Sequence, residues 1–200
     1  MLDAWTTIAG FIEKDKDRCQ LLMTCKEISK CDFYFYKFIF AKKIIEIPWF
    51  DHFVNVIVED IVVLPRSVIG VCFWYNYKKS INGMIPSTVK RVFFDDDSGE
   101  GPIIDECLPT SVTYLRFGEN FNKPIDGKFI PSVTHIVFGI KYNQPLDNLP
   151  PSLTHIKFDN VQSNSTINFL KAKSINISYN VHKEKNYSEF SWKRYFRQFD

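Results

Sequence analysis

Cysteine and histidine are the side chains in this sequence that could hold a metal ion or act as nucleophiles. The chain has 200 residues, of which five are cysteines and four are histidines. Cys19, Cys25 and Cys31 follow one another at intervals of six residues, which matches neither the Cys-x-x-Cys pattern of zinc sites nor one face of a helix. We therefore interpret these cysteines as small buried core residues. An odd cysteine count also fits reduced thiols better than a disulfide framework.

His135 and His155 occupy equivalent positions of two similar segments, so we expect them on neighbouring strands, ~4.8 Å apart along the backbone. Two adjacent imidazoles could bind a metal, but no cysteine or carboxylate occupies the positions beside them. A periodic surface position is the simpler interpretation, and we predict no metal and no cofactor. The sequence also lacks the phosphate-binding loop, the dinucleotide-binding glycine motif, the nucleophile elbow and the His-Glu-x-x-His motif. We therefore expect a protein that is not an enzyme.

The composition is that of a folded protein with balanced charge. Hydrophobic residues make up 45% of the chain and charged residues 24%, which is enough apolar material for a core. The net charge of +2 argues against non-specific binding to nucleic acid. Charged residues interrupt the most hydrophobic region, residues 33–64, so we predict no membrane span. The first residues lack the basic region of a secretory signal, and we expect a cytoplasmic protein.

Five segments of the chain repeat one pattern: a proline, a serine or threonine soon after it, and then apolar-x-x-apolar-x-Phe. The segments begin at Leu64, Ile85, Leu108, Ile130 and Leu149 and reach their phenylalanines at Phe73, Phe94, Phe117, Phe138 and Phe158. A period of about 20 to 29 residues with this pattern is typical of leucine-rich repeats, in which each coil adds one short strand to a parallel sheet. We therefore predict a strand in each segment, and a last strand over Ser174–Ser178.

Two of these coils carry a second motif after the strand, Phe121-Asn122-Lys123-Pro124-Ile125 and Tyr142-Asn143-Gln144-Pro145-Leu146. We interpret Asn122 and Asn143 as structural, because a side-chain amide can satisfy unpaired backbone groups at a turn. The strand pattern followed by this motif resembles the FNIP repeat, a leucine-rich-repeat variant found in amoebae and in the giant viruses that infect them. The resemblance implies a solenoid of stacked coils, which in a viral protein would act in the host cytoplasm.

Residues 1–49 lack the repeat and show helical spacing instead. We predict two amphipathic helices capped by Asp3 and Asp17, and a third helix through Phe35, Phe38 and Ile39. The segment Leu21–Ile28 is similar to the end of an F-box, the helical module that docks on the Skp1 adaptor of cullin-type ubiquitin ligases. That resemblance implies an adaptor-binding face made of Trp5, Ile8, Ile12, Leu21, Leu22, Cys25 and Ile28. The alternative is a plain helical cap of the solenoid that binds no adaptor.

The other candidate binding residues are the two outward positions of each strand, which alternate with core positions. Basic and aromatic side chains gather there and suit an acidic or phosphorylated target protein, although an ordinary solvated face is the alternative. These residues are Arg91, Phe93, Tyr114, Arg116, His135, Val137, His155 and Lys157.

These patterns predict an α+β chain in three parts. A short helical, F-box-like module spans residues 1–49, and a leucine-rich-repeat-like solenoid with a parallel sheet spans residues 50–180. A capping helix follows at residues 181–200, where Trp192, Tyr195, Phe196 and Phe199 share one side. We expect an interaction adaptor in which the first part recruits Skp1 and the solenoid selects a target for ubiquitination. The alternative is a repeat protein that only sequesters a partner.

Overall fold

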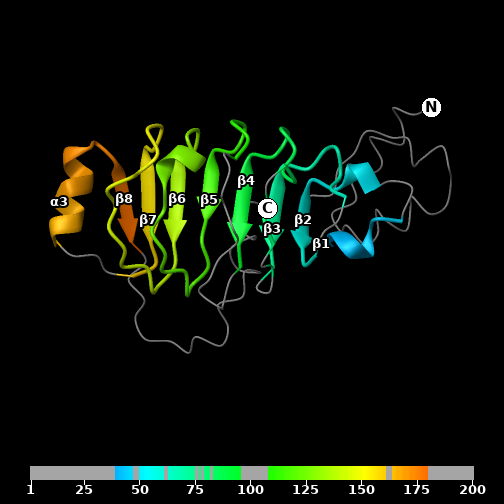
Figure 1. The fold of residues 1–200 in the computed structure, drawn as a ribbon, viewed down its shortest axis with the longest axis horizontal. Helices are drawn as coiled ribbons and strands as arrows, with labels where there is room; N and C mark the ends of the chain where they lie inside the picture. Colours follow the sequence, from blue (N-terminus) through cyan, green and yellow to red (C-terminus); the bar gives the residue numbers. More distant parts are fainter. Residues whose placement is uncertain are drawn as a thin grey trace, which may run out of the picture.

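A single parallel sheet organises the part of the chain that the structure describes. The computed structural model describes residues 39–46, 50–60, 63–74, 77, 79–81, 83–95, 108–160 and 164–179. Eight strands hydrogen-bond in chain order, each parallel to its neighbours. They are β1 (Ile39–Phe40), β2 (Asn55–Val58), β3 (Gly70–Phe73), β4 (Arg91–Phe94), β5 (Tyr114–Arg116), β6 (His135–Phe138), β7 (His155–Phe158) and β8 (Asn176–Tyr179). Each coil adds one strand, and the coils stack into a β-solenoid along the horizontal axis of Figure 1, which confirms the predicted parallel-sheet solenoid.

Helices are few in this described part. Three are short 3-10 turns, η2 (Ala41–Lys43), η3 (Phe50–His52) and η4 (Gly127–Phe129). The only α-helix within the described ranges is α3 (Asn164–Ala172). The predicted helices of residues 1–38 and the capping helix of residues 181–200 lie outside the described residues, so the α+β division stays a prediction.

The inward side of each strand carries the core. The middle apolar residue of every repeat lies in one register row, from Val71 through Leu115 to Ile156. The phenylalanines that end the repeats stack on one another with ring centroids 5.4–5.6 Å apart, as Phe117 and Phe138 do. The stacked rings bury large apolar surfaces against one another along the core, and aromatic contacts of this kind stabilise a core beyond the burial of their area alone.

The proline of each repeat forms a turn at the start of the strand. In four coils the proline carbonyl accepts a hydrogen bond from the amide three residues later, at 2.9–3.2 Å, as Pro109 does from Val112. The coil of Pro131 is one residue shorter, and there Ile130 supplies the carbonyl to Val133 at 3.2 Å. The fixed φ of proline suits such a turn, so the motif sets where each strand begins.

Two features of the later coils require small or amide-bearing residues. A Cβ added at Gly139 would lie 2.2 Å from the carbonyl oxygen of Gly118 in the preceding coil, so the glycine after the phenylalanine lets backbones approach closely. The side-chain oxygen of Asn122 accepts the backbone N–H of Asn143 one coil later at 2.9 Å. Asn160 makes a different contact, because its side-chain amide donates to the Tyr142 carbonyl of the preceding coil at 3.1 Å. The bond of Asn122 agrees with the structural role predicted for this asparagine.

The structure corrects two sequence expectations. Ile39, expected in a helix, lies in β1, because the backbone of Ile39–Phe40 pairs with β2. The last strand spans Asn176–Tyr179 rather than Ser174–Ser178, since Ser174 turns with a positive φ of 57° after α3 and Ile177 pairs with Ile156.

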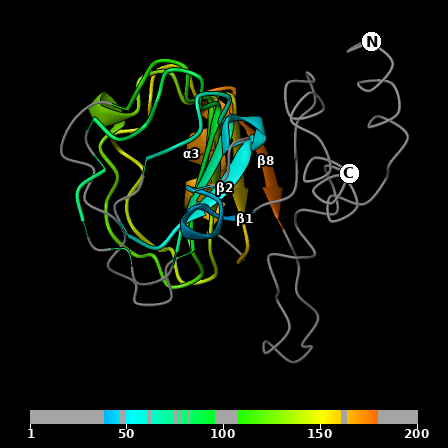
Figure 2. The same ribbon diagram turned by 90° about the vertical axis from the view of Figure 1, so that its right-hand side faces the viewer.

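Two further elements had no counterpart among the expectations. Strand β2 ends in Val58 where later strands end in phenylalanine, so the repeat pattern does not mark it. Helix α3 packs on β8, and its Leu170 is fully buried. The helix stands beyond β8 in Figure 1 and within the outline of the coils in Figure 2. It therefore covers core at this end of the described solenoid.

Candidate interaction surface

The side of the sheet away from the core carries two rows of side chains, which we call the outward face. Strand pairing aligns the first row and the second row position by position across β2–β8. All eight residues predicted for the sheet face lie in these rows. The first row is Asn55, Gly70, Arg91, Tyr114, His135, His155 and Asn176, and the second is Ile57, Cys72, Phe93, Arg116, Val137, Lys157 and Ser178.

On β2–β4 the second row of the outward face is apolar and nearly inaccessible. Ile57, Cys72 and Phe93 form a cluster of their own, with exposed fractions of 1%, 5% and 4%. Burial raises the pKa of the Cys72 thiol, so the thiol stays protonated. Phe93 and Val137 were predicted as contact residues, but each is only 4% exposed. These two side chains therefore act as packing residues in the chain as it stands.

The two arginines of the outward face already have partners within the chain. A guanidinium nitrogen of Arg116 lies 3.1 Å from a carboxylate oxygen of Asp159, and the two side chains are only 16% and 3% exposed. A guanidinium nitrogen of Arg91 lies 3.4 Å from the amide oxygen of Asn55, and desolvation lowers the pKa of this arginine. The predicted basic band is therefore largely neutralised or shielded at β4 and β5.

Aromatic and imidazole rings continue the first row across β5–β7. Tyr114 lies 5.6 Å from Phe93 and 6.5 Å from His135, measured between ring centroids. His135 and His155 are closer, with centroids 4.3 Å apart and planes inclined by only 3°. Burial raises the pKa of Tyr114 to about 12, so its hydroxyl is neutral at physiological pH.

Threonines fix the tautomer of both histidines. The hydroxyl of Thr134 donates to the Thr113 carbonyl at 3.1 Å and lies 2.8 Å from Nδ1 of His135. The hydroxyl has a single proton, which it donates to the Thr113 carbonyl, so its oxygen accepts a hydrogen bond from Nδ1–H of His135. Thr154 and His155 repeat the arrangement at 3.1 and 2.9 Å. Both rings therefore present an unprotonated Nε2 away from the backbone.

Asn176 completes this ladder on β8. Its amide nitrogen lies 3.1 Å from Nε2 of His155, where it donates. His135 Nε2 has no such partner within the described part of the chain. Burial, followed by the neighbouring His155, lowers the pKa of His135, which keeps that ring neutral at pH 7.

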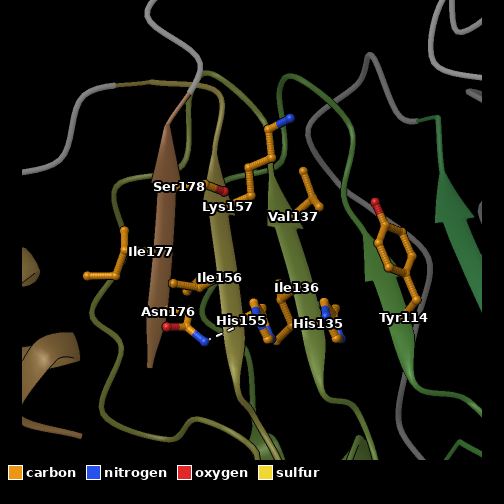
Figure 3. A pocket seen from close by; sticks show the side chains of 10 residues that line it. All are labelled: Tyr114, His135, Ile136, Val137, His155, Ile156, Lys157, Asn176, Ile177 and Ser178. Atoms are coloured by element: carbon orange, nitrogen blue, oxygen red, sulfur yellow. Dashed lines mark hydrogen bonds between the residues drawn. The ribbon is translucent and has the colours of Figure 1, made fainter. Parts of the chain in front are cut away.

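A shallow hollow of about 220 Å³ lies over the outward face of β5–β8. Figure 3 shows the two histidines side by side in it, with Asn176 reaching toward His155 and Lys157 at the other end of the strand. The lining is mostly apolar, with a few polar groups that could orient a ligand. The arrangement can offer hydrogen-bond acceptance, ring stacking and one cation.

The histidine pair gives little support for a metal centre. Within the described ranges, no group of three or more histidine, cysteine or acidic residues could hold a metal ion. The rings of His135 and His155 are nearly parallel, so their Nε2 lone pairs point the same way rather than to one point.

No helix in the described ranges is long and apolar enough to cross a membrane.

Sequence reasoning found the rows but missed the residues that hold them. Thr134, Thr154, Asn176 and Asp159 were not singled out, although the repeated Thr-His pair before β6 and β7 was visible in the sequence. The predicted adaptor-binding residues Trp5, Ile8, Ile12, Leu21, Leu22, Cys25 and Ile28 lie outside the described residues.

Comparison with known proteins supports the repeat assignment. The family model of the FNIP repeat matches residues 101–141, the stretch that contains β5, η4 and β6. No curated protein matches the chain. The match agrees with the resemblance drawn from the strand pattern and the asparagine motif. It indicates a repeat-containing protein-interaction module.

Proposed function

We propose that this chain is a non-catalytic protein-interaction module that binds a partner protein through the β5–β8 part of the outward face. The observation that carries the proposal is the hollow over these strands, in which His135, His155 and Lys157 stand on a regular sheet. A sheet holds such side chains in fixed relative positions, which lowers the entropy that a partner must overcome on binding. Solenoids commonly use one continuous face in this way.

We further propose that residues 1–49 connect the bound partner to a Skp1-type adaptor of a cullin ubiquitin ligase. The support is the similarity of Leu21–Ile28 to the end of an F-box. The chain would then supply proximity, because holding target and ligase together raises their effective concentration. The family match covers the repeat region alone, which favours the second candidate, a module that sequesters its partner without any ligase.

The first test asks whether the outward face is the binding surface. The purified chain is immobilised, and proteins retained from a lysate of its own cells are compared by mass spectrometry with those retained by a His155→Ala/Lys157→Glu variant. A Lys123→Glu variant is the matched control, because Lys123 is an exposed lysine outside both rows. We expect a partner that the control retains and the face variant loses. A partner set that is the same for all three chains contradicts the proposal.

The second test addresses the adaptor. Binding of the full chain to a Skp1 homologue is measured by interferometry at physiological salt. We expect sub-micromolar affinity, about 8 kcal/mol or more. It should be lost in a Leu22→Asp/Cys25→Asp variant. Binding that this double variant leaves unchanged, or no binding at all, would leave the sequestering module as the function.

A further inference from the structure

Lys157 differs from the two arginines of the outward face, because it has no partner among the residues that the structure describes. Arg116 is paired with buried Asp159, and Arg91 bonds to Asn55. Within the described part of the chain, no carboxylate or hydrogen-bond acceptor meets the ammonium of Lys157, which stands at the rim of the hollow. The cation that this face can offer to a partner is therefore on β7, next to the two histidines.

The histidine pair can take up a proton only at Nε2. Thr134 and Thr154 hold the Nδ1–H group of each ring. A proton on Nε2 of His135 makes that ring an imidazolium beside the ring of His155, with the ring centroids 4.3 Å apart.

No described group around the pair neutralises that charge. Tyr114 on β5 is neutral, and Asn176 and Ser178 on β8 carry no charge. Lys157 on β7 is positive, and the Arg116–Asp159 pair is neutral as a unit. Protonated His135 therefore has no anion beside it within the described chain, and an acidic partner would supply one.

We infer that the hollow over β6–β8 receives an acidic segment of the partner protein, whose carboxylates contact Lys157 and protonated His135. The inference rests on the proposed function and names the chemistry of its partner. Both arginines of the face are engaged within the chain, so the face offers a partner single charged or hydrogen-bonding groups, such as the ammonium of Lys157, and no free guanidinium fork. Binding of this segment strengthens as the pH falls, since the complex holds a proton that the free face gives up.

The experiment measures how a labelled acidic peptide binds to the full chain. The probe is a fluorescein-labelled peptide of alternating glutamate and serine, and its control has glutamine in place of every glutamate. Anisotropy is recorded at physiological salt at about pH 5.5 and about pH 7.5, where glutamate stays ionised. We expect the glutamate peptide to bind about tenfold more tightly at the lower pH, the effect of a one-unit rise in the pKa of His135 on binding. The glutamine peptide should show no such change.

Three variants assign the effect to residues. Lys157→Gln should weaken binding of the glutamate peptide at both pH values. Lys123→Gln, which changes an exposed lysine outside both rows, should leave binding of this peptide unchanged. His135→Asn/His155→Asn should remove the pH dependence and keep the binding that remains at about pH 7.5.

The inference is overturned by equal affinity at both pH values, or by a glutamine peptide that binds as well as the glutamate peptide. Equal effects of Lys157→Gln and Lys123→Gln also overturn it, as does a single-stranded oligonucleotide that outcompetes the peptide. None of these results contradicts the proposed function, which is tested by whether the variant of the outward face loses a partner protein that the control variant retains.

Discussion

The outward face of β2–β4 and that of β7 and β8 follow one strand register, but their second rows differ in exposure. At β2–β4 the second row holds Ile57, Cys72 and Phe93, all at most 5% exposed. At β7 and β8 the same row holds half-buried Lys157 and exposed Ser178. Strand pairing sets where a side chain stands, and the side chain decides whether the position packs or binds. A solenoid can therefore change the role of its face from one coil to the next.

The sharpest test of this contrast compares one substitution in each half. Phe93→Ala removes a 4% exposed ring from the β2–β4 cluster and should lower the free energy of unfolding by about 3–5 kcal/mol. His155→Ala removes an exposed ring from β7 and should change it by no more than about 0.5 kcal/mol. Urea unfolding of the two variants checks the difference. A loss below about 1 kcal/mol for Phe93→Ala would mean that this half is surface and not core.

A second contrast concerns the charges at the boundary of the two halves. Arg116→Ala leaves the 3% exposed carboxylate of Asp159 without its arginine and should cost about 2–3 kcal/mol, somewhat less than a fully buried pair because Arg116 keeps 16% exposure. Lys157→Ala, in the same row two strands away, should be nearly neutral because no described partner is lost. Thermal unfolding of both variants distinguishes them. Equal losses would show that Arg116 and Lys157 are equivalent surface cations.

The repeat pattern predicted the fold better than it predicted the site. Five strands and their register followed from the spacing of the phenylalanines, because period and alternation are local properties of the chain. Strand β2 and helix α3 did not follow, since Val58 replaces the phenylalanine and α3 belongs to no repeat.

The residues of the outward face were predicted correctly, but their burial and their pairing within the chain were not. That Arg116 is neutralised depends on Asp159, which lies 43 residues away and beside a different strand. That Phe93 is packed depends on contacts with other coils. Both properties depend on tertiary contacts. The residue types along a row do not show which side chains are already paired or packed.

The tautomer of the histidines provides a finer test of the β6–β8 half. Thr154→Val removes the hydroxyl that accepts from His155 Nδ1–H and donates to the Thr134 carbonyl, at an expected cost of about 1 kcal/mol. Nitrogen chemical shifts of His155 should then report a mixture of tautomers, whereas wild type shows Nδ1–H alone. Thr88→Val is the control, because Thr88 is an exposed threonine of another coil. Unchanged shifts in Thr154→Val would remove the threonine from the site.

The smallest expected effect is the pH dependence of stability that His135 contributes. Its pKa in the folded chain lies below the ordinary value of 6.5, because burial and His155 disfavour its charged form. The unfolded chain therefore binds more protons than the folded chain just below pH 6.5, so stability is complete above this value and falls as the pH drops toward the folded pKa.

Urea midpoints of wild type and His135→Asn across this range measure that contribution as the difference between two slopes. The wild type should lose more stability on acidification than the variant. Equal slopes of urea midpoint against pH would show that burial and His155 do not lower the pKa of His135. The acidic peptide should reduce the dependence of wild-type stability on pH, because a carboxylate beside His135 raises the pKa of that ring. Protonation of His135 would then destabilise the free folded chain and stabilise its complex with the peptide. On β2–β4 no comparable effect is expected, since the described second-row residues there carry no group that titrates near neutral pH.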